Sequence, residues 1–496
     1  MRSRAFLYTS LALGCASPAA AQAHETFDLV ILGGRVIDPV TKRDEIANVA
    51  IDGRRIVRIS PGPMRGRRTV DAAGLVVAPG FVDLHAHGQH DIGQRLQVLD
   101  GVTTAIDAEA GAMPLAPFFN HLSGKALINF GATASHRCAR MKVLTGTLCK
   151  GHPAANGESG IDHKALNLAA TPAQEEQIVA ALDREVKVGA LGYGLGIEYT
   201  PGAGRREIYA VFKAAARLAA PVFVHVRSRP LDTAPGVPIA VVQEVIANAA
   251  VTGAALQIAH IHSTGLRDTP VLVDMVKSAR ARGLDITTEA YPYTAGSTMI
   301  GSEFFRDGWQ QRSNISFGDL QWPATGERLS QQSFDHFRKE QPTSNVIVHM
   351  IPQQIVDQVV MDPDISIASD GMAWKTSGEH PRGAGTFSRV LGRYVRERGA
   401  PSLVEALAKM TIMPARRLEK IAPAMSRKGR IQVGADADIT IFDAALINDR
   451  ATFEKPMQAS VGIRHVIVNG RAVVANGQLV ANIFPGEAVK SRYAAR

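Results

Sequence analysis

The chain is 496 residues long, and 46% of its residues are hydrophobic, 20% charged and 6% aromatic, with a mean hydropathy of zero. This composition is typical of a large soluble globular protein and excludes disorder as the main state of the chain. The formal net charge is +9, but Lys and Arg form only short clusters, such as residues 65–68, without interleaved aromatic residues. These features argue against a nucleic-acid partner and favour a small anionic substrate.

The first 23 residues resemble a secretory signal peptide. Arg2 and Arg4 precede an apolar run over residues 5–14, and small residues then lead to Ala23, after which we expect cleavage. Removal of this segment changes the net charge from +9 to +9 − 2 = +7. The apolar run is too short for a permanent transmembrane helix, and no other run reaches about 18 apolar residues. The sequence therefore predicts an exported, periplasmic protein with no transmembrane segment.

Cys15 allows a second interpretation of the same segment. The sequence Ala-Leu-Gly-Cys15 resembles a bacterial lipoprotein signal, although Ala12 stands where Leu is expected. Lipid anchoring is therefore the alternative to cleavage after Ala23. If Cys15 leaves with the signal, only Cys138 and Cys149 remain, an even number in a compartment that permits disulfides. A Cys138–Cys149 bridge and two unpaired thiols both remain open.

Both ends of the remaining chain show strand patterns. Apolar residues alternate around Gly turns in residues 27–38 and 49–59, and again in residues 438–443 and 463–474. We therefore expect one small composite β-sandwich domain, formed from residues 24–78 and 421–496.

The middle of the chain alternates between short apolar runs and helical patterns. Eight apolar runs occur, at residues 81–87, 103–110, 126–136, 191–197, 221–227, 255–262, 285–293 and 366–372. Eight strands that alternate with helices are typical of an α/β fold with a (β/α)8 TIM-like barrel, here residues 79–420. Residues of about 299–344, which contain Trp309 and Trp322, interrupt this order and predict an inserted subdomain.

Metal-binding residue types occur at the ends of four of these strands. His85 and His87 lie at i and i+2 after the first apolar run, so both side chains are expected on one face. His225, His260 and Asp370 end the fifth, sixth and eighth runs. Barrel enzymes build their active sites at the carboxyl ends of the strands. The sequence therefore predicts a metal centre at the barrel mouth, held by all five residues.

This order of ligands resembles the metal-dependent amidohydrolase superfamily, and within it the D-aminoacylase, or N-acyl-D-amino-acid deacylase, family. More specific similarities are Tyr291-Pro-Tyr-Thr-Ala-Gly-Ser-Thr, His380-Pro-Arg and Leu391-Gly-Arg-Tyr-Val-Arg-Glu. The resemblance implies one or two Zn²⁺ ions, with two favoured, and hydrolysis of an amide made by the amino group of an amino acid. It also implies that Asp370 takes a proton from the attacking water and passes it to the leaving amine.

The chain departs from the family where a Cys ligand is usual, because the matching residues are Glu109-Ala110-Gly111. We expect Glu109 to bridge two metal ions as a carboxylate, so that the centre is binuclear. The alternative is that Glu109, or Asp107 two residues earlier, is a buried ion-pair partner.

A second departure concerns substrate binding. The family's His-Leu-Lys, whose Lys contacts the substrate carboxylate, is replaced by His260-Ile-His262. We expect His262 to share a strand face with His260 and to donate to this carboxylate with a weaker, pH-dependent charge; the alternative is a hydrogen-bonded core His. Tyr291 and Ser297 match family positions that hold this carboxylate, and Arg382 is a further candidate. The weaker carboxylate site leaves a dipeptidase or a cyclic-amide hydrolase as alternatives on the same metal centre, and a non-enzymatic metal- or ligand-binding protein as another. The sequence makes no prediction of the oligomeric state.

Overall fold

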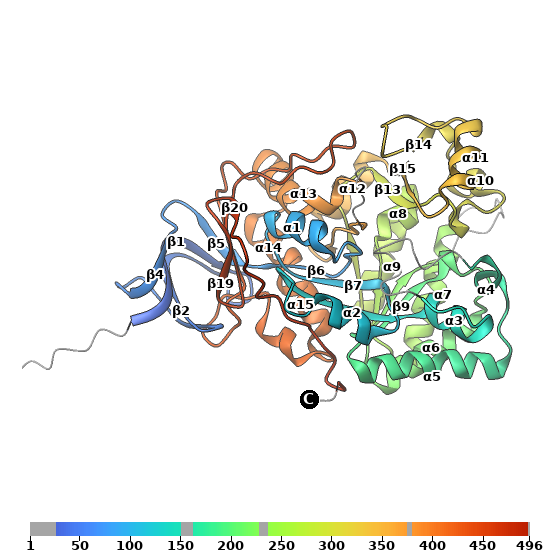
Figure 1. The fold of residues 1–496 in the computed structure, drawn as a ribbon, viewed down its shortest axis with the longest axis horizontal. Helices are drawn as coiled ribbons and strands as arrows, with labels where there is room; N and C mark the ends of the chain where they lie inside the picture. Colours follow the sequence, from blue (N-terminus) through green and yellow to red (C-terminus); the bar gives the residue numbers. More distant parts are fainter. Residues whose placement is uncertain (1–25, 150–161, 228–236, 374–378, 495–496) are drawn as a thin grey trace, which may run out of the picture.

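The computed structural model describes residues 26–149, 162–227, 237–373 and 379–494 (Figure 1). The predicted signal peptide and Cys15 lie outside these residues. None of the helices in the described part of the chain combines the length and apolar character of a membrane-spanning segment. A β-domain, a barrel and a smaller inserted sheet lie in turn across the molecule.

The barrel is a sheet of eight strands, and neighbouring strands pair parallel. Its strands are β6 (Phe81–Asp83), β7 (Val102–Ala112), β8 (Asn129–Ser135), β9 (Tyr193–Gly196), β10 (Val222–His225), β11 (Leu256–Ile258), β12 (Ile286–Ala290) and β16 (Ser366–Ile367). The two edge strands approach at the parallel bridge between Ala86 and Gly371, where the His87 amide donates to the Gly371 carbonyl oxygen at 2.8 Å. The eight predicted strands and the (β/α)8 barrel are confirmed.

Helices cover the outside of the barrel and pack against its strands (Figure 1). They are α1 (Asp91–Leu99), α2 (Leu115–Leu122), α3 (His136–Leu144), α4 (His163–Asn167), α5 (Pro172–Val188), α6 (Arg205–Arg217), α7 (Val237–Thr252), α8 (Ile261–Gly265), α9 (Thr269–Ala281), α12 (Gln353–Met361), α13 (Arg382–Arg389), α14 (Leu403–Met410) and α15 (Ile412–Glu419). Helix α5 shows why they form. Thr171 and Gln174 make a capping box before it, Gly189 ends it at φ 138°, and Ile178 and Leu182 face the core.

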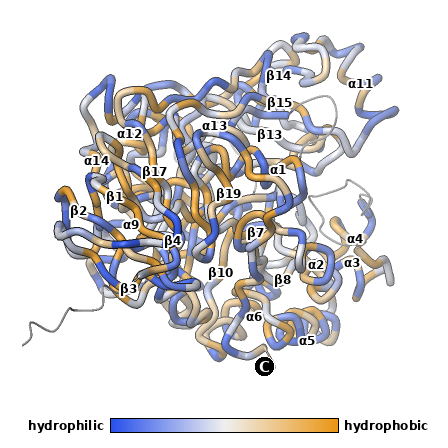
Figure 2. The backbone as a smooth tube through the Cα atoms, turned by 60° about the vertical axis from the view of Figure 1, so that its left-hand side comes forward, coloured by the Kyte–Doolittle hydropathy of each residue, from blue (hydrophilic) through white to orange (hydrophobic). Residues whose placement is uncertain are grey.

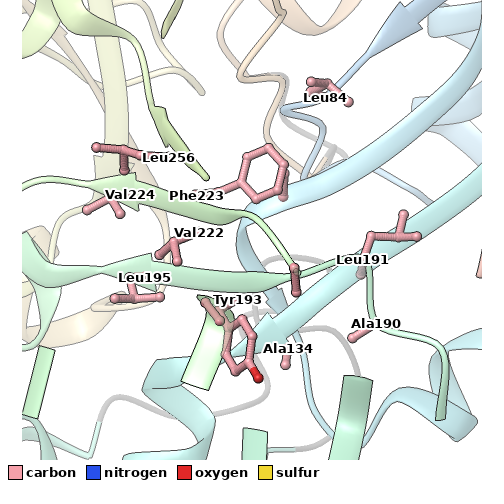
Figure 3. Close-up of a cluster of buried hydrophobic side chains, with 14 of the residues drawn as sticks. Leu84, Ala134, Ala190, Leu191, Tyr193, Leu195, Val222, Phe223, Val224 and Leu256 are labelled. Carbon is pink, nitrogen blue, oxygen red and sulfur yellow. The ribbon is translucent and has the colours of Figure 1, made fainter. Parts of the chain in front are cut away.

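The barrel strands have apolar side chains on both faces because the helices cover the outer face. Figure 3 shows Leu195, Val222, Val224 and Leu256 of three neighbouring strands in one cluster, and all four are fully buried. Figure 2 shows the hydropathy of each residue along the chain. Hydrophilic residues lie along outer segments such as helix α11 (Gln331–Glu340). This rigid interior holds the carboxyl ends of the strands in place.

The β-domain combines both ends of the described chain in one nine-stranded sheet, in the order β20-β19-β18-β17-β5-β1-β2-β3, with β4 also paired to β1. The strands are β1 (Thr26–Asp38), β2 (Arg43–Asp52), β3 (Arg55–Ser60), β4 (Arg65–Asp71), β5 (Val76–Pro79), β17 (Ile439–Phe442), β18 (Ile463–Val468), β19 (Arg471–Ala475) and β20 (Gln478–Leu479). The amino-terminal and carboxyl-terminal parts join where β5 pairs antiparallel with β17. The prediction that both ends of the chain form one β-domain is confirmed.

A separate three-stranded sheet is inserted between β12 and β16, at the upper right of Figure 1. It consists of β13 (Ala295–Met299), β14 (Leu320–Gln321) and β15 (Asn345–His349), with helices α10 (Trp309–Ser313) and α11 beside it. Trp309 and Trp322 lie in its own apolar core together with Phe305 and Phe334. The two Trp residues therefore stabilise the insertion rather than bind a ligand.

Cys138 and Cys149 form a disulfide, which resolves the alternative that the sequence left open. The bridge links helix α3 to a segment 11 residues further along the chain.

Closing a loop of this length in the unfolded chain corresponds to about 2.8 kcal/mol in the chain-entropy model. We expect the Cys138→Ser/Cys149→Ser double variant to lose about this free energy of unfolding, measured by chemical denaturation. Dithiothreitol should destabilise the wild-type protein in the same way and leave the double variant unchanged; equal stability of both proteins would contradict the prediction.

Candidate metal centre and active site

The predicted ligands converge at the carboxyl ends of the barrel strands, although most follow the strands rather than lie in them. Strand β6 ends at Asp83, two residues before His85, and β11 ends at Ile258, two residues before His260. Only His225 is the last residue of its own strand. The chain turns sharply at two of the ligands, since His260 has φ 27° and Asp370 has φ 51°. Residues other than Gly rarely adopt these values, and such strain concentrates at functional sites.

The first ligand group contains His85, His87 and Asp370. The Nε2 atoms of the two His residues are 3.0 Å apart, and they lie 3.3 and 3.5 Å from Asp370 Oδ1. Oε2 of Glu109 completes the cluster at 3.4 Å from His85 Nε2 and 3.3 Å from His87 Nε2. Ligand atoms around a tetrahedral zinc ion are about 3.3 Å apart, because the metal–ligand bonds are about 2.0–2.1 Å long. These four atoms therefore fit one zinc ion.

The second ligand group contains Glu109, His225 and His260. Oε1 of Glu109 lies 3.2 Å from Nδ1 of His225, while Oε2 faces the first group. Nε2 of His260 is 4.0 Å from Oδ2 of Asp370. Glu109 thus presents one carboxylate oxygen to each group, as a ligand between two metal ions must. This arrangement favours the bridging role over a buried ion pair.

Three of the four His rings are fixed by a partner on Nδ1, which leaves Nε2 for a metal. Nδ1 of His85 is 2.5 Å from Glu289 Oε1, and Nδ1 of His87 is 3.0 Å from Asp107 Oδ2. The partner of His260 is a hydroxyl, described below. Such partners orient metal-binding His residues and select their tautomer. Asp107, considered as an ion-pair partner from the sequence, contacts His87 in this way.

The electrostatic environment suits a cation. Burial alone would raise the pKa of Glu109, but hydrogen bonds with His225, His85 and His87 hold this pKa well below its usual range. Burial also opposes ionisation of Asp370, yet the charges of Arg382 and His85 lower its pKa. Burial and the neighbouring His225 lower the pKa of His260, so this ring is neutral, as a metal ligand must be. The carboxylates of Glu109 and Asp370 and the neutral ring of His260 match the requirements of Zn²⁺.

A buried cation lies beside the ligands. Arg382 is 1% exposed, its Nη1 lies 2.9 Å from Asp370 Oδ2, and its guanidinium stacks on the Tyr291 ring at 4.7 Å. Nε and Nη2 of Arg382, like Oγ of Ser297, have no hydrogen-bond partner among the described residues. Tyr291, Ser297 and Arg382 all line one cavity with His87, Glu109, His225, His260 and Asp370. Unpaired buried donors of this kind are suited to a carboxylate ligand.

The structure places His262 outside the cavity. Because β11 ends at Ile258, His262 lies inside helix α8 and does not share a strand face with His260, so that expectation is wrong. The side chain is fully buried, packs edge-to-face on Tyr291 at 4.3 Å, and is absent from the cavity lining. Both ring nitrogens lack a hydrogen-bond partner in the described part of the chain. The structure therefore gives His262 a packing role.

We expect His262→Phe to leave KM for an N-acyl amino acid within about twofold of the wild-type value. Phe preserves the aromatic contact with Tyr291, and replacing an unpaired buried polar group by an apolar one of similar shape is nearly neutral. Steady-state kinetics check this, with Tyr291→Phe as the comparison that should raise KM. A large rise in KM for His262→Phe would return His262 to the substrate site.

The cavity measures about 160 Å³, and its far wall contains residues that the sequence did not identify. Cationic side chains from three parts of the barrel and the insertion reach it, namely Arg137, Arg227 and Arg312. Met299, Phe304 and Met350 add apolar surface. Arg137 follows Ser135 at the end of β8, and only this position at a strand end could have marked it in the sequence. Three Arg side chains and the carboxylate of Glu198 therefore share this part of the cavity lining.

Comparisons with known proteins identify the family of this chain. Residues 203–474 match the Amidohydrolase family. N-acyl-D-glutamate deacylase from Alcaligenes xylosoxydans xylosoxydans is 31% identical over 479 residues, which cover 90% of this chain and 94% of that protein. D-aminoacylase from the same organism is 30% identical over 481 residues, 90% of this chain and 95% of that one.

A solved structure gives the same result in three dimensions. The N-acyl-D-glutamate deacylase of Bordetella bronchiseptica, complexed with zinc and a phosphonate mimic of the tetrahedral intermediate, superposes with a TM-score of 0.78 at 27% identity. The similarity covers 94% of this chain and 100% of that chain. The protein therefore belongs to the amidohydrolase family and is a hydrolase of carbon–nitrogen amide bonds.

Proposed function

We propose that the protein is a zinc-dependent deacylase that hydrolyses N-acyl-D-amino acids to a carboxylic acid and a free amino acid. The observation that carries this proposal is the buried Arg382, whose Nη1 lies 2.9 Å from Asp370. In an N-acyl amino acid only the amide nitrogen and Cα separate the scissile carbonyl from the carboxylate. A carboxylate held by Arg382 therefore places the amide beside the metal ligands.

The two ligand groups could hold two zinc ions, with Glu109 offering one carboxylate oxygen to each group. His85, His87 and Asp370 would hold one ion, and His225 and His260 the other. Zinc bound there would lower the pKa of a water to about 7 and polarise the carbonyl oxygen. The ligand residues fix where this chemistry takes place, at the base of the cavity.

Asp370 is the proton carrier of the proposed reaction. Its carboxylate lies between the His ligands and Arg382, which keeps it ionised and able to accept a proton from the attacking water. The water oxygen bonds to the carbonyl carbon, and Asp370 then passes the proton to the amide nitrogen. The C–N bond breaks, because a protonated amine is a far better leaving group than an amide anion. Asp370 returns to its ionised form.

Tyr291, Ser297 and Arg382 orient the substrate. The guanidinium offers two nitrogens without partners, and Ser297 adds a free hydroxyl on the same cavity wall. Together they can bind both oxygens of a carboxylate in a fixed direction. The D configuration is proposed from the activity of the relatives, N-acyl-D-glutamate deacylase and D-aminoacylase.

The test is hydrolysis of a panel by the purified zinc-loaded protein. The panel contains the D and L forms of N-acetyl derivatives of acidic, neutral and basic amino acids, together with dipeptides and hydantoins. We expect the highest kcat/KM for N-acetyl-D-amino acids. Activity confined to hydantoins would replace the proposal by a cyclic-amide hydrolase, activity confined to dipeptides by a dipeptidase, and absence of all activity would end it.

We also propose that the protein is exported, on the basis of Arg2, Arg4 and the apolar run that follows them. Expression in a bacterium followed by fractionation and amino-terminal sequencing tests this. A periplasmic protein beginning at His24 is the expected result. A lipid-modified Cys15 would establish the alternative anchor, and an uncleaved cytoplasmic chain would contradict both.

A further inference from the structure

Ser263 lies next to the metal ligand His260. It follows His260 by three residues in helix α8 and lines the cavity. Its Oγ is 2.8 Å from Nδ1 of His260 and 3.0 Å from the carbonyl oxygen of the same residue. One hydroxyl thus contacts both the ring and the backbone of His260.

The hydrogen-bonding capacity of Ser263 assigns the protons on His260. A hydroxyl has one proton to donate and two lone pairs that accept. Ser263 donates to the His260 carbonyl oxygen, so its Oγ accepts from Nδ1–H of His260. The lone pair of the ring is then on Nε2, the nitrogen that faces Asp370 and the second ligand group. Ser263 therefore selects the tautomer that binds a metal.

Ser263 also fixes the backbone of His260. The φ and ψ angles of His260 are 27° and 59°, in the left-handed region that residues with a side chain rarely adopt. The amide nitrogen of Ser263 donates to the His260 carbonyl oxygen at 3.0 Å, and Oγ donates to the same atom. Both contacts hold the turn that points the ring toward Glu109.

This arrangement differs from that of the first ligand group. His85 and His87 are each held by a carboxylate, from Glu289 and Asp107, on a different barrel strand. His260 is held by the neutral hydroxyl of Ser263, three residues further along the chain. The second ligand group therefore depends on a hydroxyl where the first depends on carboxylates.

We propose that Ser263 is a positioning residue for the second metal-ligand group. It fixes the tautomer and direction of His260. The inference rests on the proposed function only in that His260 binds a metal.

The test measures zinc retention rather than turnover. Zinc-loaded wild-type protein and the Ser263→Ala variant are dialysed against graded chelator, and the bound zinc is determined. Loss of a partner to a metal-binding His typically weakens the metal by about 10–100-fold, so Ser263→Ala should release one zinc ion at a correspondingly lower chelator activity. Ser263→Thr keeps the hydroxyl and should restore the wild-type curve.

Thr269→Val is the matched control. The Thr269 hydroxyl donates to the Leu266 carbonyl oxygen at 2.7 Å and so supports the same segment, but it does not contact His260. This variant should retain zinc as the wild-type protein does. A Ser263→Ala curve that matches the wild type, or an equal loss in Thr269→Val, would overturn the proposal.

Failure of the deacylase proposal would appear differently, as a normal zinc curve with no hydrolysis of any substrate in the panel.

Discussion

Asp370→Asn is expected to lower kcat by about 10³-fold or more, since a positioned proton carrier contributes about 10²–10⁴-fold and its loss affects two proton transfers. Asn has the same shape and can still offer an oxygen to the first ligand group, but it cannot carry the proton from water to the leaving nitrogen. Initial rates at saturating substrate, normalised to bound zinc, measure this effect. The zinc content should remain close to that of the wild type, because His85, His87 and Glu109 are unchanged.

Asp449→Asn is the matched control for this substitution. Asp449 also pairs with an Arg, since its Oδ2 lies 2.9 Å from Arg389 Nη1, but it does not line the cavity. The same chemical change there should leave kcat near the wild-type value. If Asp370→Asn retained more than about one tenth of the wild-type kcat with full zinc, Asp370 would not be the proton carrier.

Arg382→Met is expected to lower kcat/KM for an N-acetyl amino acid by about 100-fold. A hydrogen bond to a charged group contributes about 1.5–3 kcal/mol, and the substrate carboxylate would lose its buried cation. Met keeps an apolar chain over the Tyr291 ring, where the guanidinium now stacks at 4.7 Å. Most of the loss should appear in KM.

A comparison of two substrates separates the lost contact with the substrate carboxylate from the lost contact between Arg382 and Asp370. The N-acetyl amino acid amide has no carboxylate, so the substitution should reduce its kcat/KM by less than about tenfold. Changes at Asp370 affect both substrates equally and cancel in the ratio. Equal losses for the acid and the amide would show that Arg382 serves Asp370 alone.

The strand order was predictable because burial on both faces leaves a clear signal. The eight barrel strands are short apolar runs between amphipathic helices, and each was found at its expected place. The strand ends were less predictable, since apolar residues such as Leu84 and Ala259 continue the pattern beyond the last paired residue. Hydrogen bonding between strands, which the apolar pattern does not record, sets these ends.

His262 shows the consequence of predicting a strand end too late in the chain. A strand through residue 262 would place His260 and His262 on one face, but the chain turns at His260 and enters helix α8. The turn depends on backbone angles and on Ser263, and neither gives a periodic signal. Because the predicted strand end was wrong, His262 was expected in the cavity, whereas its side chain lies in the core.

The ligand set was easier to predict than its supporting contacts. His85, His87 and Asp370 follow strand ends, and Glu109 was found because it stands where a family ligand is expected. Glu289, which holds His85, lies within β12 and resembles any polar residue in a buried strand. Partners from distant segments become visible only when the barrel brings its strands together.

The central claim is that Glu109 bridges two metal ions. Elemental analysis of the wild-type protein beside Glu109→Ala tests this claim most directly. Glu198→Ala is the control, because Glu198 lines the same cavity and its Oε2 lies 4.0 Å from His225 Nε2, outside both ligand groups. We expect two zinc ions per chain in the wild type and in Glu198→Ala, and one or none in Glu109→Ala. A zinc content that is unchanged by Glu109→Ala would contradict a centre bridged by this carboxylate.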